Sequence, residues 1–206
     1  MEYLWKFLTS DQVTKESKGK IPKMTREQAA GQIGAWIVET GKANLTGLDV
    51  VEKGNSSKGR GLSQYTGVRR VAYDRARSAA LAKGENPNSA QWQARYFAQE
   101  YAGQHDRGGS LIGWTRVFEQ APAKGSPSFF AKYFTGSAAE GKGYFRPGTP
   151  HTESRQNAAE QVLKLFSQPA QAKPAPTPQP KPAAPAAASR PGWLDQLKIP
   201  SLGTLF

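Results

Sequence analysis

The sequence predicts a mainly α-helical single domain over residues 25–168, followed by an extended tail. Apolar residues recur at three- and four-residue spacing in several segments, and several of these segments begin with a helix-capping residue. No sustained alternation of apolar and polar residues occurs, so we expect at most a small hairpin within residues 44–66. The 206 residues leave room for one domain of roughly 150 residues and flanking segments.

The first 24 residues combine a short amphipathic stretch with a polar continuation. The apolar residues are Tyr3, Leu4, Trp5, Phe7 and Leu8, and lysines follow at positions 15, 18 and 20. A segment of this length cannot bury a core of its own, so we expect residues 1–24 to form an N-terminal arm.

The first helix of the domain is expected to start after Thr25. Thr25 followed by Gln28 is a capping-box signature, and Gly41 is a natural helix end. Apolar residues then recur on one face of the helix, at Ala29, Ala30, Ile33, Trp36 and Ile37. Glu39 falls in the last turn, where the partial negative charge of a helix C-terminus disfavours a carboxylate. That placement hints at a functional role.

Further helices are predicted over residues 70–83, 88–102, 110–120 and 152–167. Ser126 and Pro127 match an N-cap with proline at the first helical position, so a short aromatic helix is expected to follow them. Glycine-rich turns over 103–109 and 135–150 separate these elements.

The tail has two parts. Residues 169–191 are rich in proline and alanine and contain no aromatic residue, which predicts an extended linker without a core. Residues 192–206 are strongly apolar, and we expect them to dock onto a partner protein. The docking residues would be Trp193, Leu194, Leu197, Ile199 and Phe206. The alternative is that this peptide folds back on its own domain.

Composition excludes several classes of site. The chain has no cysteine, and His105 and His151 are far apart in the sequence, so no metal site and no cofactor are expected. No stretch has the length of a membrane span, and the N-terminus lacks the basic start and apolar run of a signal peptide. The net charge of +12 favours polyanionic surroundings. Specific DNA binding is not expected, because Asp74 interrupts the only arginine cluster.

One segment carries most of the functional information: Gly59-Arg60-Gly61-Leu62-Ser63-Gln64-Tyr65-Thr66-Gly67-Val68-Arg69, about two dozen residues after Glu39-Thr40. It resembles the pattern of a glutamate followed by a Gly-Leu-x-Gln turn in goose-type lysozymes and lytic transglycosylases, and more closely the version in phage tail-associated lysozymes. The resemblance implies a lysozyme-like, helix-dominated α+β fold and cleavage of peptidoglycan glycan strands. It covers residues 25–80; the later Asn-containing segment of transglycosylases has no counterpart.

The resemblance also implies roles for individual residues. Glu39 would be the general acid, whose proton the leaving sugar oxygen requires. Ser63 and Gln64 would contact the substrate, and Tyr65 would offer a stacking surface to a sugar. The backbone at Gly59 and Gly61 would pass close to the sugar, whereas Leu62 and Arg69 would be structural.

Two questions stay open at this stage. Asp49 and Glu52 are candidates for an assisting carboxylate, or else they hold the loop through caps and ion pairs. A transglycosylase would need no second acid, because a hydroxyl of the sugar replaces water. Arg60 could pair with Glu39 and favour its ionised form, which would hinder acid catalysis.

The sequence therefore favours a virion-associated peptidoglycan hydrolase, muramidase or lytic transglycosylase, that opens the cell wall during genome delivery. It would be tethered to tail or internal virion proteins by residues 192–206 and act in the periplasm. The alternative is a structural virion component whose lysozyme-like fold is inactive.

Overall fold

The structure, a computed structural model, describes residues 1–51, 58–105, 116–137, 142–145 and 147–168. Its helices in chain order are α1 (Glu2–Leu8), α2 (Asp11–Glu16), α3 (Arg26–Thr40), α4 (Gly67–Ala82), α5 (Ala90–Tyr101), α6 (Pro127–Thr135) and α7 (Thr152–Ser167). The helices expected near 25–40, 70–83, 88–102, 126–134 and 152–167 are all present. The one predicted over 110–120 lies mostly outside the described residues, and its described end, 117–120, is a turn.

Capping residues set the ends of α3 as the sequence predicts. The Thr25 hydroxyl accepts a hydrogen bond from the Gln28 backbone N–H at 3.2 Å, and the Gln28 side chain accepts one from the Thr25 N–H at 2.8 Å. Gly41 ends the helix in the left-handed region, with φ of 62°.

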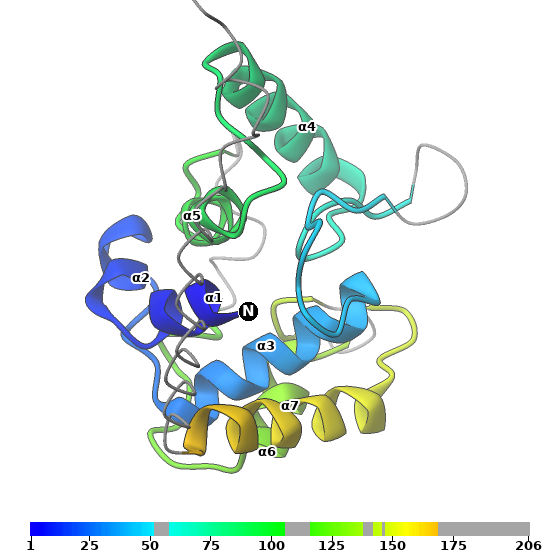
Figure 1. Ribbon diagram of the computed structural model, residues 1–206. Helices are drawn as coiled ribbons and strands as arrows, with labels where there is room; N and C mark the ends of the chain where they lie inside the picture. Colours follow the sequence, from blue (N-terminus) through cyan, green and yellow to red (C-terminus); the bar gives the residue numbers. More distant parts are fainter. Residues whose placement is uncertain (52–57, 106–115, 138–141, 146, 169–206) are drawn as a thin grey trace, which may run out of the picture. The chain divides into compact units, whose positions relative to one another are not determined.

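Helices α3, α6 and α7 pack tightly against one another (Figure 1). Glycines on α3 permit this approach. A Cβ at Gly31 would lie 2.6 Å from the Phe130 Cβ of α6, and one at Gly34 would lie 2.5 Å from the Ala159 backbone nitrogen of α7. Helices α6 and α7 therefore approach the backbone of α3 on two sides. A side chain at position 31 or 34 would prevent this close approach.

The prediction of an N-terminal arm is wrong. Residues 1–24 contain α1 and α2, and six of their apolar side chains are at most 6% exposed: Leu4, Phe7, Leu8, Val13, Ile21 and Met24. These side chains join the main core that also contains Trp36 and Phe97. The segment needs no core of its own, because α1 packs on α3 and α5 and α2 packs on α5.

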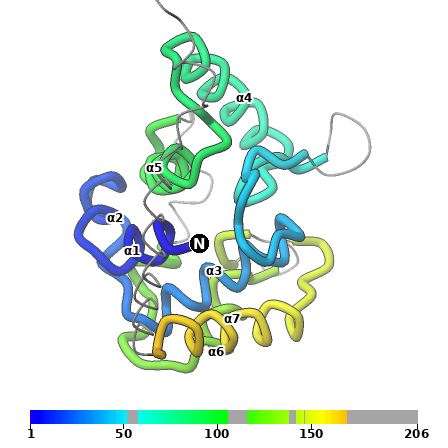
Figure 2. The backbone as a smooth tube through the Cα atoms, in the orientation of Figure 1, coloured from blue at the N-terminus to red at the C-terminus, as the bar shows by residue number. Residues whose placement is uncertain are grey.

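Side chains of α4 and α5, whose backbones are drawn in Figure 2, form a second, smaller core. Tyr73 of α4 packs edge-on against Trp92 and Tyr96 of α5, with ring centroids 5.5 and 5.0 Å apart. Tyr65, just before α4, stacks on Tyr73 at 5.0 Å. This aromatic cluster fixes residues 59–69, the glycine motif identified in the sequence.

The hairpin expected within residues 44–66 is reduced to isolated antiparallel bridges. In the described part of that segment these are Val51 with Arg60 and Arg60 with Tyr65. The described part of the chain is thus helix-dominated, as predicted. Within the described residues no helix is long and apolar enough to span a membrane.

Candidate active site around Glu39

Glu39 lies in the last turn of α3, and its side chain is 14% exposed. Its Oε1 accepts a hydrogen bond from Nη2 of Arg155 at 2.8 Å. Arg155 belongs to α7, which runs antiparallel to α3: Glu39 meets the start of α7, and Arg26 at the start of α3 meets Phe166 near its end (Figure 1). The close contact between Gly34 and Ala159 brings the two helices near enough for this ion pair.

Arg155 is held independently of Glu39. Its side chain is 3% exposed, and it donates to the carbonyl oxygens of Pro150 at 2.7 Å and Ala35 at 3.3 Å. Its guanidinium also lies 5.5 Å from the ring centroid of Phe145. Arg155 therefore fixes the position of the Glu39 carboxylate and stabilises its charge.

Arg60, which the sequence left open as a partner of Glu39, binds two other carboxylates in the structure. Its Nε and Nη2 bind the Asp49 carboxylate at 2.8 and 2.9 Å, and its Nη1 lies 3.5 Å from Asp74. Among the described residues, the arginine that contacts Glu39 is Arg155, 116 residues away in sequence.

The glycines of the motif make room for protein side chains. A Cβ at Gly59 would lie 2.7 Å from Gln64 Oε1, and one at Gly61 would lie 2.7 Å from the Tyr73 ring. Gly61 also has φ of 78°, and its N–H donates to the Val50 carbonyl at 2.8 Å. Gln64 and Tyr73 therefore occupy the space that the missing side chains of Gly59 and Gly61 leave open. From the sequence we expected the backbone at these glycines to lie close to a sugar.

Gly61→Ala should destabilise the fold by about 1–3 kcal/mol, because it adds a clash with Tyr73 to the strain of positive φ. Gly47→Ala is the matched control: Gly47 has φ of 64° but no heavy atom within 4 Å of its would-be Cβ. We expect the control to lose only the backbone term, about 1 kcal/mol. Urea unfolding measures the loss in the free energy of unfolding for each variant. Equal losses would show that a clash with Tyr73 does not contribute to the effect of Gly61→Ala.

Of the three predicted substrate contacts, two are covered by the protein. Ser63 is 3% exposed, and its hydroxyl accepts from Trp36 Nε1 at 3.0 Å. Tyr65 is fully buried, and Tyr73 and Tyr96 pack against its ring, so the expected sugar-stacking surface is not available. The expectation failed because Tyr73, one helical segment further along, and Tyr96 of α5, remote in sequence, both pack on the Tyr65 ring.

Gln64 differs from its neighbours. It is half-buried with φ of 46°, and its Nε2 donates to the Gly61 carbonyl at 3.0 Å. Its Oε1 is buried and has no hydrogen-bond partner within the described residues. An unpaired buried acceptor is costly, which keeps Gln64 as a candidate for substrate contact.

Asp49 is the centre of an ion-pair network instead of an exposed second acid. Besides Arg60, its carboxylate accepts from Arg77 Nε at 2.6 Å and from the Tyr73 hydroxyl at 2.9 Å. Burial opposes ionisation, but the hydrogen bonds from Arg60, Arg77 and Tyr73 outweigh it and hold the pKa of Asp49 below its ordinary value. These contacts match the alternative that Asp49 holds the loop. Glu52, the other candidate, lies outside the described residues.

Asp49→Asn should lower the free energy of unfolding by about 2 kcal/mol at pH 7, because two arginines lose their charged acceptor. Since the folded pKa of Asp49 is depressed, its contribution is complete above the unfolded pKa of about 4 and is lost as pH falls through the folded value. The wild type and the variant should therefore converge in stability as pH falls through the depressed folded pKa of Asp49. Urea titrations between pH 7 and pH 2.5 test this, and a difference that does not depend on pH would contradict it.

Comparison with known proteins decides the family. The model of the family described as "Phage tail lysozyme" matches residues 1–166, which includes α1 and α2 as well as the glycine motif. The chain belongs to the phage tail lysozyme family. No curated protein and no solved structure matches it. Membership confirms the resemblance seen in the sequence and indicates a phage-associated, lysozyme-type glycosidase.

This phage tail lysozyme also contains a buried ion pair that the sequence analysis did not identify. Arg69 Nε binds Glu100 Oε1 at 2.6 Å, and the Arg69 guanidinium lies 4.7 Å from the ring centroid of Tyr144. The Tyr144 hydroxyl donates to Glu100 at 3.2 Å and lies 3.3 Å from the Ser63 hydroxyl. Burial, followed by the charge of Glu100, raises the pKa of Tyr144, which stays protonated.

The position of Glu100 in the sequence already indicates a buried carboxylate. It lies three and four residues after Phe97 and Tyr96, on the apolar side of its helix, where an acid must have a partner. Arg69 was expected to be structural, and its contacts agree. The described residues contain no group of three histidine, aspartate or glutamate side chains that could hold a metal ion.

Proposed function

We propose that this chain is a virion-borne peptidoglycan glycosidase that cleaves the β-1,4 bond between N-acetylmuramic acid and N-acetylglucosamine during genome delivery. The observation that carries the proposal is the placement of Glu39. It ends α3, it is largely buried, and Arg155 on α7 fixes its carboxylate. A single carboxylate held in one orientation is what proton transfer to a glycosidic oxygen requires.

Glu39 has to carry a proton when the glycosidic bond breaks. The ion pair with Arg155 favours the charged carboxylate in the free protein, which opposes the acid step just as a pair with Arg60 would have done, but suits the second role of Glu39 as a base toward water or a sugar hydroxyl. A bound glycan strand would exclude water from the carboxylate and thereby favour the protonated form. Arg155 would keep the carboxylate in place during both steps.

The products distinguish hydrolysis from transglycosylation. Purified sacculi would be digested in ¹⁸O-labelled water and the soluble fragments weighed by mass spectrometry. Hydrolysis places labelled oxygen at the new reducing end, whereas transglycosylation gives a 1,6-anhydro end that is lighter by one water. Fragments with cleaved peptide bonds and intact glycan would contradict both.

The Glu39–Arg155 ion pair also favours a second candidate, a structural tail component whose lysozyme fold is inactive. A permanently charged Glu39 would act only as a structural partner of Arg155. Folded wild-type protein that leaves sacculi intact would support this candidate.

Association with the particle would depend on residues 192–206, the predicted docking peptide, which lies outside the described residues. We expect a phage that encodes only residues 1–191 to assemble particles that lack the protein, since the apolar anchor would be missing. Immunoblots of purified particles measure this, and normal incorporation would exclude the docking role.

A further inference from the structure

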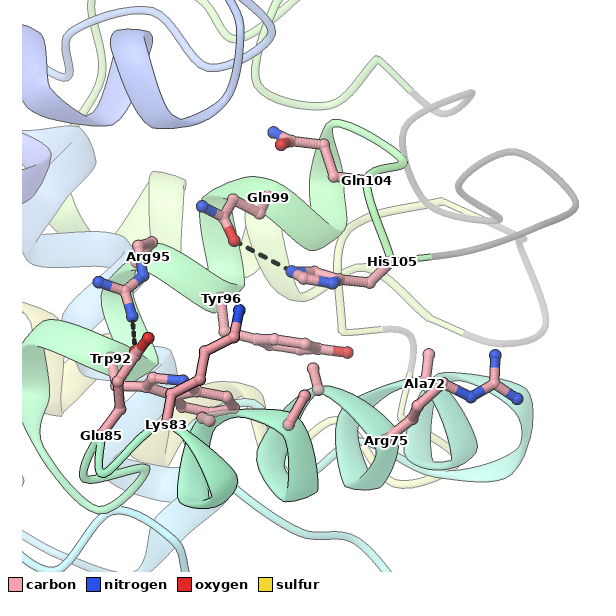
Figure 3. Close-up of a pocket in the computed structure, with 13 residues that line it drawn as sticks. Ala72, Arg75, Lys83, Glu85, Trp92, Arg95, Tyr96, Gln99, Gln104 and His105 are labelled. Atoms are coloured by element: carbon pink, nitrogen blue, oxygen red, sulfur yellow. Dashed lines mark hydrogen bonds and ion pairs between the residues drawn. The ribbon is translucent and has the colours of Figure 1, made fainter.

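A cavity of ≈ 530 Å³ lies between α4 and α5 (Figure 3). Arg75 and Lys83 reach it from the α4 side, Arg95 and Gln99 from α5, and Gln104 and His105 from the segment that follows α5. Neither Glu39 nor any residue of the 59–69 motif lines it. We call this site the α4–α5 groove.

The floor of the groove is made of small and buried groups. Four alanines of α4 line it: Ala72, Ala76, Ala79 and Ala80. The aromatic rings beneath are almost fully covered, with Trp92 6% and Tyr96 2% exposed. Neither ring offers a free face, so the groove is unsuited to stacking of sugars or nucleobases. A chain with small side chains would fit the alanine floor.

The charges of the groove are not balanced within the protein. Glu85 pairs with Arg95, but Arg75 and Lys83 are exposed and make no ion pair with any described residue. The two are eight residues apart in and just beyond α4, which corresponds to about 12 Å along a helix axis. Figure 3 shows Arg75 toward the His105 end and Lys83 toward the Arg95–Glu85 pair.

An unsatisfied donor lies at the same place. The hydroxyl of Tyr96 is buried and has no hydrogen-bond partner among the described residues. Its ring stacks under His105 at 4.7 Å, and His105 Nε2 lies 3.1 Å from Gln99 Oε1. Burial raises the pKa of Tyr96, so the phenol remains a donor. A buried donor without an acceptor is unfavourable, and a bound ligand that supplies an acceptor would remove this cost.

We infer that the α4–α5 groove binds a short acidic peptide with small side chains, and specifically the stem peptide of peptidoglycan. This identification rests on the proposed function, because the stem peptide is attached to the glycan that the enzyme would cut. Stem peptides contain alanines, which suit the alanine floor, and free carboxylates, which suit Arg75 and Lys83. Four extended residues span about 13 Å, close to the axial rise between positions 75 and 83.

The test measures binding of a free, glycan-free tetrapeptide stem (L-Ala, γ-D-Glu, diaminopimelate, D-Ala) to the full chain by calorimetry. Arg75→Ala/Lys83→Ala should weaken binding at least about tenfold, because each cation loses a charged hydrogen bond. Lys132→Ala/Lys164→Ala, two exposed lysines of α6 and α7, is the control with the same change in net charge. It should bind as the wild type does.

Three results would overturn the inference: no binding of the stem peptide, equal loss in both double variants, or undiminished binding of a stem peptide whose carboxylates are amidated. If binding of a DNA oligonucleotide, and not of the stem peptide, is weakened in Arg75→Ala/Lys83→Ala, the groove would be assigned to nucleic acid instead. The assay contains no glycan, so it is independent of catalysis. Peptide binding without cleavage of sacculi would refute the proposed function, and cleavage without peptide binding would refute the groove.

Discussion

Glu39→Gln is expected to lower the rate of muropeptide release from purified sacculi by about 10²–10⁴-fold, the usual contribution of a general acid or base. Glutamine has the shape of glutamate and can still accept a hydrogen bond from Arg155, but it cannot transfer a proton. Rates would be followed by turbidity and by chromatography of soluble fragments.

Two checks make this result specific. Glu153→Gln changes the same functional group on the exposed first turn of α7, two residues before Arg155, and should retain wild-type activity. Circular dichroism should show that both variants are folded. Full activity in Glu39→Gln would remove Glu39 from the reaction, whatever the family.

Arg69→Met is expected to be the most destabilising of the substitutions considered, by about 3–5 kcal/mol. It leaves the Glu100 carboxylate, 6% exposed, without its guanidinium partner. Since small domains are stable by only about 5–15 kcal/mol, the variant would lose a large part of its stability. Urea unfolding at 15 °C measures the loss.

A double-mutant cycle separates the ion pair from simple packing. Arg69→Met/Glu100→Leu removes both charges, so it should lose less stability than the sum of the two single variants, by about 2 kcal/mol or more. Additive losses would mean that the two side chains contribute through packing alone.

Local signals in the sequence were sufficient for most of the helical structure. The capping box of Thr25 and Gln28, the stop at Gly41 and the Ser126-Pro127 start all appear in the structure as predicted. These features depend on contacts within a few residues, which a sequence pattern records directly. The placement of Glu39 at the end of α3 followed from the same signals.

Most of the errors concern contacts between residues that are distant in sequence. Residues 1–24 were expected to be an arm because the segment is short, yet α3 and α5 supply the core that it lacks. Tyr65 was expected to face a sugar, yet Tyr73 and Tyr96 cover it. The partner of Glu39 was sought nearby in the motif, whereas Arg155 comes from the last helix. No local pattern encodes such pairings.

The central claim, that a fixed Glu39 cleaves glycan strands, is tested most directly by the wild-type protein and purified sacculi alone. We expect soluble disaccharide fragments with new reducing or 1,6-anhydro ends and intact stem peptides. Intact sacculi after incubation with a folded protein, or release of peptides only, would contradict it and leave the Glu39–Arg155 pair with a purely structural role.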